Sequence, residues 1–340
     1  MEFLTEYGVF LLKVITIALA ITIPLLLVIG TSKSKNPSKG SLIVKNLSKK
    51  YEDMGTAIRI SQLNPKELKK YNKEIQKKKK ADDKKPSKED SVYVLNFNGD
   101  IQASEVAKLK HEINAILLSD TKCKEVVIKV ESGGGSAYAY GLCAAELKRL
   151  VDNKIKLTVC IDKVAASGGY LMSCVASKII AAPWAIVGSI GVIAQLPNFH
   201  RLLKKNSIDF EMHTAGEFKR TLTTLGENTE EGRKKFKTEL EDLHVIFKDF
   251  VKEQRPQVDT KIVATGEVWQ GKKAIEVGLI DALSTSDDYL VRLSKKLKLF
   301  EIEYVEKKNL TERFAISTQL LIEKSFLKFY DIINRDRFIS

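Results

Sequence analysis

Two glycine-rich turns could supply catalytic chemistry, because each directly follows a predicted strand. The first is the stretch 132–135, SGGG, after the apolar run 126–130. In the second, Ser167 follows a loop of small residues and precedes Gly168 and Gly169. Glycines between a strand and a helix let backbone N–H groups point into a cleft, where they suit a phosphate or a developing oxyanion. The phosphate-binding motifs GxGxxG, GKS and GKT are absent, so nucleotide binding is weakly supported.

Ser167 is the candidate nucleophile, because it would begin a helix. A hydroxyl there lies in a positive field, and the N–H groups that follow are free to bind a negative oxygen. Serine is also a common helix cap, so Ser167 by itself fits a structural role better. A serine nucleophile needs a partner that accepts its proton, and none of the four histidines lies in a glycine-framed loop. His213, in the apolar run FEMH, is interpreted instead as a packed strand residue.

Lysine is the alternative base, provided that its amine is neutral near pH 7. The ordinary lysine pKa of about 10.4 would have to fall by roughly three units, which costs about 4 kcal/mol. Burial supplies such a shift, so the candidate should lie in an apolar, glycine-bounded turn rather than in a run of charges. Lys219, within HTAGEFKRTLTTLGENT, meets this condition best, although Arg220 beside it must point away.

The elements that must position these residues alternate along the chain. Strands separated by helical patterns predict an α/β fold with a largely parallel sheet. The predicted strands are 92–96, 126–130, 155–161 and 178–182, and the predicted helices are 103–118, 136–151, 167–176, 230–255 and 310–335.

The composition predicts a folded core and a separate basic arm. With 340 residues, 44% of them hydrophobic and 29% charged, the chain is not wholly disordered. Residues 33–90 hold 18 Lys or Arg and 8 Asp or Glu, and therefore most of the net charge of +13. A basic balance confined to one segment does not predict a nucleic-acid-binding domain. The cysteines form no CxxC pair, which predicts reduced, buried thiols and no zinc site.

The N-terminus predicts a membrane anchor at 1–32. Residues 9–29 are apolar apart from Lys13 and just reach the roughly 20 residues that a transmembrane helix needs. A cleaved signal peptide is the alternative, but the start is acidic and no clear small-residue cleavage site follows. The lysines after the apolar run favour a cytoplasmic body by the positive-inside rule. In the basic linker, 33–90, the lysines either rest on anionic lipid or belong to a solvated helix.

Several blocks of the chain resemble the protease IV / signal peptide peptidase A family of membrane-bound serine peptidases. They are ESGGG, DKVAASGGY, AIVGSIGVIAQLPNF, HTAGEFKRTLTTLGENTEEGR and VATGEVW, in the order of the family. The resemblance covers nearly the whole chain. It implies a ClpP/crotonase-like fold with an N-terminal transmembrane helix, a peptidase domain at 91–300 and a C-terminal helical extension at 301–340.

The resemblance also implies a Ser–Lys catalytic dyad. The family's nucleophile falls on Ser167, its general base on Lys219, and the serine that orients the lysine amine on Ser189. The oxyanion hole falls on the N–H groups of Gly168 and of a glycine in the first loop, Gly134. No metal or organic cofactor is implied.

The partners implied by the resemblance are a peptide or unfolded protein substrate, membrane lipid and further copies of the chain. The copies would form a homo-oligomeric ring at the cell inner (cytoplasmic) membrane, where the lysine of one protomer can complete the site of its neighbour. The family is often described on the other side of the membrane from the one that the lysines favour, so the side stays open.

The expected function is a membrane-anchored serine endopeptidase that cleaves extended peptides or unfolded segments. One departure is visible, because the family usually has proline where this chain has Gly133, which puts the rigidity of the loop in doubt. A catalytically silent scaffold that binds a partner is therefore the alternative. An enzyme acting on acyl-CoA thioesters would need active-site carboxylates, and only Glu131 lies near a glycine loop. Residues 181–199 are apolar enough for a second span but are predicted to form a buried strand and turn.

Overall fold

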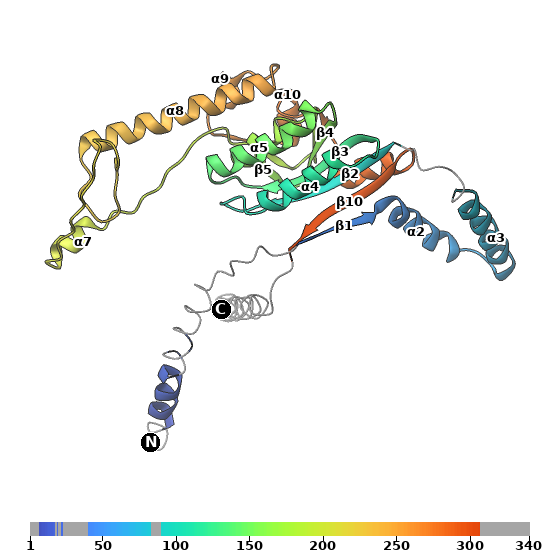
Figure 1. Ribbon diagram of the computed structural model, residues 1–340, viewed down its shortest axis with the longest axis horizontal. Helices are drawn as coiled ribbons and strands as arrows, with labels where there is room; N and C mark the ends of the chain where they lie inside the picture. Colours follow the sequence, from blue (N-terminus) through green and yellow to red (C-terminus); the bar gives the residue numbers. More distant parts are fainter. Residues whose placement is uncertain (1–6, 18, 20–21, 23–39, 83–89, 307–340) are drawn as a thin grey trace, which may run out of the picture. The chain divides into compact units, whose positions relative to one another are not determined.

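The computed structural model describes residues 7–17, 19, 22, 40–82 and 90–306 (Figure 1). The chain divides into two compact units, of which Leu42–Tyr304 is the larger and contains every candidate catalytic residue. Within the described ranges, no helix combines the length and the apolar character that crossing a membrane requires. Most of the predicted anchor, the end of the basic linker and the predicted helix 310–335 lie outside these ranges.

One ten-stranded sheet organises the larger unit. Its strands run in the order β1-β10-β2-β3-β4-β6-β9, and a branch leaves β3 through β5 and β7 to β8. The pairings from β10 across to β9 are parallel, and β7 pairs with β8 antiparallel. The predicted α/β fold with a largely parallel sheet is confirmed. The strands are β1 Ser41–Asn46, β2 Ser91–Gly99, β3 Cys123–Ser132, β4 Lys156–Ile161, β5 Val164–Ala166, β6 Lys178–Ala181, β7 Ile186–Gly188, β8 Val268–Gln270, β9 Ala282–Leu283 and β10 Lys298–Val305.

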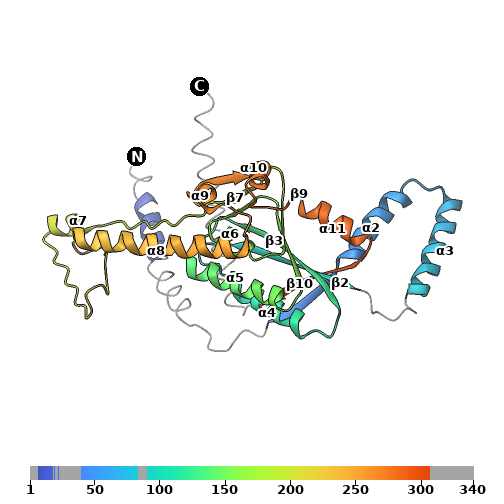
Figure 2. The ribbon, with the colours of Figure 1, turned by 90° about the horizontal axis from the view of Figure 1, so that it is seen from above.

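Helices cover both faces of the sheet, which is why its central strands are almost continuously apolar (Figure 2). On one face, α4, α5 and α6 enclose the main core around Leu95, Leu147 and Tyr170. On the other face, Leu47 of α2 and Leu290 of α11 pack in a second core. The helices are α2 Leu47–Ile60, α3 Pro65–Asp82, α4 Val106–Leu118, α5 Ala137–Asp152, α6 Gly168–Ser173, α7 His200–Lys205, α8 Glu230–Gln254, α9 Thr260–Val263, α10 Gly271–Glu276 and α11 Ser286–Ser294.

The structure corrects one local expectation and confirms another. His213 does not lie in a packed strand, because it is exposed in an irregular segment. The apolar stretch 181–199 does form a strand and turn, with β7 paired between β5 and β8. Only the first half of this stretch is buried, however, and its second half lies in the segment described next.

Residues 192–229, which we call the arm, form an excursion that includes α7 and contains no buried residue. The arm packs on the first turns of α8, where the Lys235 ammonium lies 5.3 Å from the centre of the Phe218 ring. It is held together by its own contacts, since the Asn198 side chain donates to the carbonyls of Thr223 and Gly226. The arm therefore lies outside the core that the sheet and its helices form.

A buried ion pair fixes the opposite end of α8. The Arg255 guanidinium, whose side chain is 5% exposed, donates to both carboxylate oxygens of Asp281 at 2.7 and 3.0 Å. Asp281 also accepts from the N–H of Ile179 in β6. The pair thus joins the end of α8 to the sheet, and loss of Asp281 would leave the Arg255 charge buried without a carboxylate.

We expect Asp281→Ala to lower the free energy of unfolding by about 3–5 kcal/mol, because Arg255 would keep its buried charge without a partner. Glu241→Ala is the matched control, since Glu241 pairs with Lys237 at 3.8 Å on the exposed face of α8. It should cost less than about 1 kcal/mol. Urea unfolding of the two variants in detergent measures the difference, and equal costs would contradict the structural role of the buried pair.

Candidate active site

Ser167 lies at a strained turn between β5 and α6. Its backbone has φ 51° and ψ −119°, in a region that non-glycine residues rarely occupy. The turn is fixed because the Ser167 N–H donates to the Gly188 carbonyl at 2.7 Å. A strained strand-to-helix turn presents its side chain outward, as in nucleophile elbows. The side chain of Ser167 is accordingly half-buried, whereas its neighbours Ala166 and Gly168 are buried.

The glycine loop after β3 presses directly against this turn. Gly134 has φ 90°, and a Cβ added to it would lie 2.7 Å from both the Gly168 nitrogen and the Ser167 Cβ. The Gly134 N–H donates to the Ser132 hydroxyl at 3.0 Å. By contrast, the N–H groups of Gly135 and Gly168 have no acceptor within the described part of the chain. In this conformation, the Gly168 N–H next to Ser167 is therefore free, whereas the Gly134 N–H is occupied by Ser132.

Ser189 stands next to the same turn. It follows Gly188, the residue that accepts from Ser167, and it too has a positive φ of 50°. Its N–H donates to the Glu267 carbonyl at 2.7 Å, and its hydroxyl to the Gly266 carbonyl at 3.4 Å. The structure thus brings Ser167, Gly168, Gly134 and Ser189 into one neighbourhood. Gly266 and Glu267, which belong to the block VATGEVW, were not predicted to lie at the site.

Lys219 is not part of this neighbourhood in the single chain. It lies in the arm, exposed to solvent, and its amine has no hydrogen-bond or ion-pair partner among the described residues. The arm contacts α8 near Lys235, whereas the nucleophile region meets α8 at His244, whose Nε2 lies 3.2 Å from the Ile190 carbonyl oxygen. Nine helical residues separate these contacts, which is about 13 Å along the axis. The desolvation that a lysine base requires is therefore not provided within one chain.

The three buried thiols do not compete with Ser167 as nucleophiles. Burial raises the pKa of the thiols of Cys143, Cys160 and Cys174 to about 12, so they stay protonated and unreactive. The predicted reduced, buried thiols are confirmed at these positions. The described residues also contain no cluster of acids, histidines or cysteines that could hold a metal ion.

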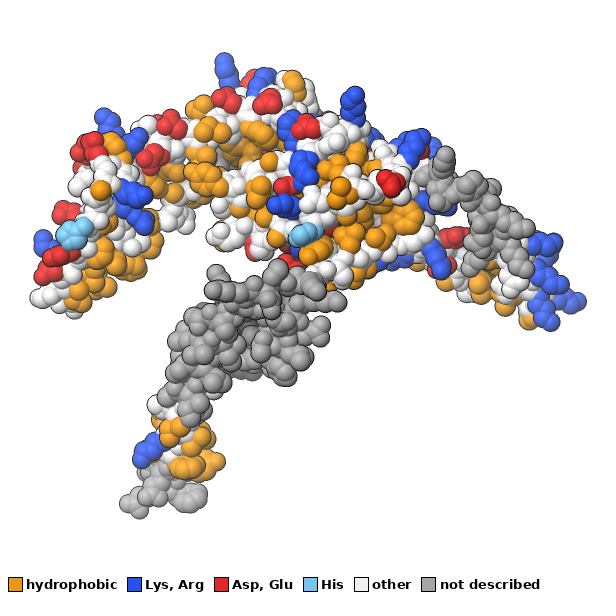
Figure 3. Space-filling view, viewed as in Figure 1, with side chains coloured by type: hydrophobic (Ala, Val, Ile, Leu, Met, Phe, Trp, Pro, Cys, Tyr) orange, Lys and Arg blue, Asp and Glu red, His pale blue; other side chains and the backbone are white. Residues whose placement is uncertain are grey.

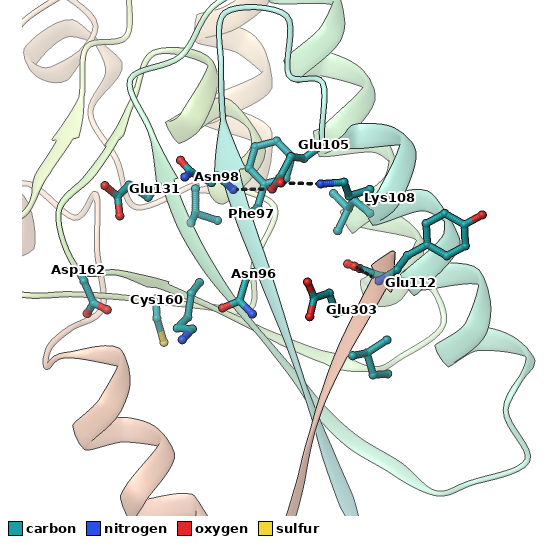
Figure 4. A pocket seen from close by; sticks show the side chains of 15 residues that line it. Asn96, Phe97, Asn98, Glu105, Lys108, Glu112, Glu131, Cys160, Asp162 and Glu303 are labelled. Carbon is teal, nitrogen blue, oxygen red and sulfur yellow. Dashed lines mark hydrogen bonds and ion pairs between the residues drawn. The ribbon is translucent and has the colours of Figure 1, made fainter. Parts of the chain in front are cut away.

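A charged pocket of about 330 Å³ lies elsewhere on the sheet, where β10 parts from β2, and none of the predicted catalytic residues lines it (Figure 4). Two carboxylates there, at the N-cap and in the middle of α4, accept from backbone N–H groups. Glu105 accepts from Asn98 at 2.8 Å and Glu112 from Tyr304 at 2.9 Å. Burial raises the pKa of Glu112 to about 7. These acids satisfy the backbone of the parted strands, so the pocket has a structural explanation.

Comparison with known proteins decides the family. Residues 149–300 match peptidase family S49, and residues 2–147 match the peptidase family S49 N-terminal region. The chain belongs to peptidase family S49. Its members are serine proteases, and the family resemblance drawn from the sequence is confirmed together with the enzyme class. In this family S49 protease, the catalytic roles of Ser167, Lys219 and Ser189 remain predictions.

Two sequence relatives support the assignment over almost the full length. Probable protease SohB of Haemophilus influenzae is 45% identical over 326 residues, which cover 92% of each chain. Probable protease SohB of Buchnera aphidicola subsp. Schizaphis graminum is 46% identical over 331 residues, or 95% of each chain. Among solved structures, a mutant of the 1510-N membrane-bound stomatin-specific protease matches 60% of this chain and 84% of its own, with 14% identity and a TM-score of 0.41.

We expect Gly134→Ala to reduce peptidase activity by about a hundredfold or more, because the new Cβ would push the loop away from Ser167 and Gly168. Gly133→Ala is the matched control one residue earlier, where an added Cβ meets nothing within 4 Å. Its activity should stay within about twofold of wild type. Initial rates of hydrolysis of an unfolded protein substrate measure the activity of both variants. If Gly134→Ala is as active as Gly133→Ala, the close approach at Gly134 is not required.

Proposed function

We propose that this S49 protease is a membrane-anchored serine endopeptidase that hydrolyses extended peptides or unfolded segments on a ClpP/crotonase-like fold. The observation that carries the proposal is the strained Ser167, which stands against the glycine loop and is followed by the Gly168 N–H, which has no acceptor among the described residues. Such an arrangement suits a nucleophile whose attack creates an oxyanion. The predicted Lys219 and Ser189 supply the base and the hydroxyl that orients it.

The reaction follows from these roles. The Ser167 oxygen attacks the scissile carbonyl carbon while the neutral Lys219 amine takes the hydroxyl proton. The oxyanion formed is stabilised by the N–H of Gly168 and by a second N–H from the glycine loop. When the C–N bond breaks, the Lys219 ammonium returns the proton to the leaving amine. Water then attacks the acyl-enzyme carbonyl carbon and gives a proton to Lys219. When the ester C–O bond breaks, the Lys219 ammonium returns this proton to the Ser167 oxygen, and the acid product leaves.

A neighbouring copy of the chain supplies the lysine in this proposal. Within one chain Lys219 is exposed in the arm and apart from Ser167, so neither its position nor its solvation suits a base. The arm also exposes apolar side chains that favour burial against another protomer (Figure 3). Contacts of this head-to-tail kind close into rings, which agrees with a homo-oligomer. The exposed apolar residues of the arm include Leu196, Phe199, Leu202, Ile208, Phe210, Met212 and Phe218.

Membrane lipid is the second proposed partner, and it is supported by α3. The half-buried Leu68, Tyr71 and Ile75 lie on one face of this helix, and the Arg59 guanidinium of α2 sits 4.7 Å from the centre of the Tyr71 ring. The opposite face carries exposed lysines that have no ion-pair partner among the described residues. Lysines near an anionic bilayer contribute about 1 kcal/mol each. They are Lys66, Lys69, Lys70, Lys73 and Lys77.

The unassembled dyad also favours a second candidate function. A chain whose Lys219 stays in solvent has no base for Ser167, and it would then act as a partner-binding scaffold on the same fold. The two functions differ in whether a second copy of the chain restores chemistry, so one mixing experiment separates them.

We expect Ser167→Ala and Lys219→Ala each to abolish hydrolysis of casein. Mixed rings, formed when the two variants are co-expressed, should regain activity. In a random ring of equal proportions, about a quarter of the sites would combine an intact serine with a neighbour's intact lysine. Light scattering confirms equal assembly of each preparation. If the wild-type chain forms the oligomer but hydrolyses casein no faster than the variants, the scaffold function is favoured. If the wild-type chain is active and the mixed rings are inactive, the dyad lies within one chain.

For the lipid partner, we expect hydrogen exchange across 65–77 to be several-fold slower in vesicles with phosphatidylglycerol than in phosphatidylcholine alone. Replacing the five lysines of α3 by glutamine should remove the difference, as should high salt. The control variant carries the same charge change at five exposed lysines elsewhere, Lys110, Lys234, Lys272, Lys273 and Lys296. Equal exchange in both vesicles for the wild-type chain would exclude contact of α3 with anionic lipid.

A further inference from the structure

Tyr140 contacts both halves of the proposed oxyanion site. It lies in the first turn of α5, just after the glycine loop, and its side chain is completely buried. Its ring packs directly on the backbone beside the nucleophile, since a Cβ added to Gly168 would lie 2.5 Å from the Tyr140 Cγ. Its hydroxyl meets the other half, because it lies 2.5 Å from the hydroxyl oxygen of Ser132.

The hydroxyl of Tyr140 is the middle of a chain of hydrogen bonds with one possible direction. The Gly134 N–H can only donate, and it donates to Ser132 Oγ at 3.0 Å. The Asp100 carbonyl can only accept, and it accepts from Tyr140 Oη at 2.7 Å. Each hydroxyl has one proton, so the remaining proton, on Ser132, must point to Tyr140 Oη. The chain therefore runs from Gly134 through Ser132 and Tyr140 to Asp100.

The surroundings leave this chain no room to rearrange. Ser132 is 2% exposed, and a Cβ added to Gly99 would collide with the Tyr140 hydroxyl and approach Ser132 Oγ within 2.6 Å. Burial raises the pKa of Tyr140, so the phenol keeps its proton and remains a donor. A buried polar network in which every member is satisfied holds its parts in one geometry.

We infer that Tyr140 is the positioning residue of the oxyanion hole, because its ring sets Gly168 while its hydroxyl sets the glycine loop through Ser132. The inference rests on the proposed function and deepens it. By holding the Gly134 N–H in a bond to Ser132, the chain of hydrogen bonds fixes the loop backbone that lies against Ser167 and the Gly168 nitrogen. Tyr140 itself touches neither substrate nor the reacting atoms.

The test is Tyr140→Phe, which keeps the ring on Gly168 and removes the hydroxyl. Because small displacements of catalytic groups reduce rates strongly, kcat should fall about tenfold to a hundredfold while KM stays within about twofold. Inhibition by a peptide aldehyde, whose adduct with Ser167 carries an oxyanion, should weaken in parallel with kcat, and binding of a non-covalent product peptide should not. Ser132→Ala should give the same pattern. The kcat of the double variant should be no lower than that of the less active single variant.

Tyr93→Phe is the matched control. Tyr93 is also buried, and its hydroxyl is hydrogen-bonded to Thr121, near the start of β2 and outside the proposed site. This variant should lose comparable thermal stability but keep kcat within about twofold. If Tyr140→Phe and Ser132→Ala retain wild-type kcat and aldehyde affinity, the inference is overturned while the peptidase stands. A wild-type chain without activity overturns both proposals together.

Discussion

The close approach of two backbone turns is the constraint on which the rest of this site depends. The turn after β3 and the turn after β5 meet where Gly134 lies against Ser167 and Gly168, and no side chain fits between them. Parallel neighbours in a sheet end at the same edge, so the pairing of β3 with β5 brings the two turns together. The strain at Ser167 is the cost of this arrangement, and the hydrogen bond to Gly188 helps to maintain it.

The arm carries the predicted base, Lys219, which must be desolvated before it can act. A lysine in solvent keeps its proton near neutral pH, and a loop without buried residues cannot change that by itself. An arm that exposes both its lysine and its apolar side chains is therefore consistent with a group that becomes buried only on assembly. In this view the nucleophile is prepared by folding and the base by association, which would keep an isolated chain inactive.

The sequence predicted the elements well, because they depend on local periodicity. The strand predicted at 126–130 and the helix predicted at 230–255 are β3 and α8, and the α/β class followed from their alternation. It did not predict which glycine N–H is free, since the bond from Gly134 to Ser132 depends on how the loop folds back. The prediction that His213 lies in a strand was wrong, because an apolar run in the arm is locally indistinguishable from one in the sheet. The sequence did not indicate a role for Tyr140 at the site, because an aromatic residue in a helix ordinarily belongs to the hydrophobic core.

The replacement of the family's proline by Gly133 now has a physical account. Proline would stiffen the loop by restricting the unfolded chain, an effect of about 0.4–1 kcal/mol at a compatible position. Gly133 is exposed and a Cβ there would meet nothing, so the position carries no packing on which the loop depends. The loop is held instead one residue on either side, by Ser132 in the chain to Tyr140 and by Gly134 against Ser167. Rigidity from folded contacts can replace rigidity from proline, and the departure is then no sign of a decayed site.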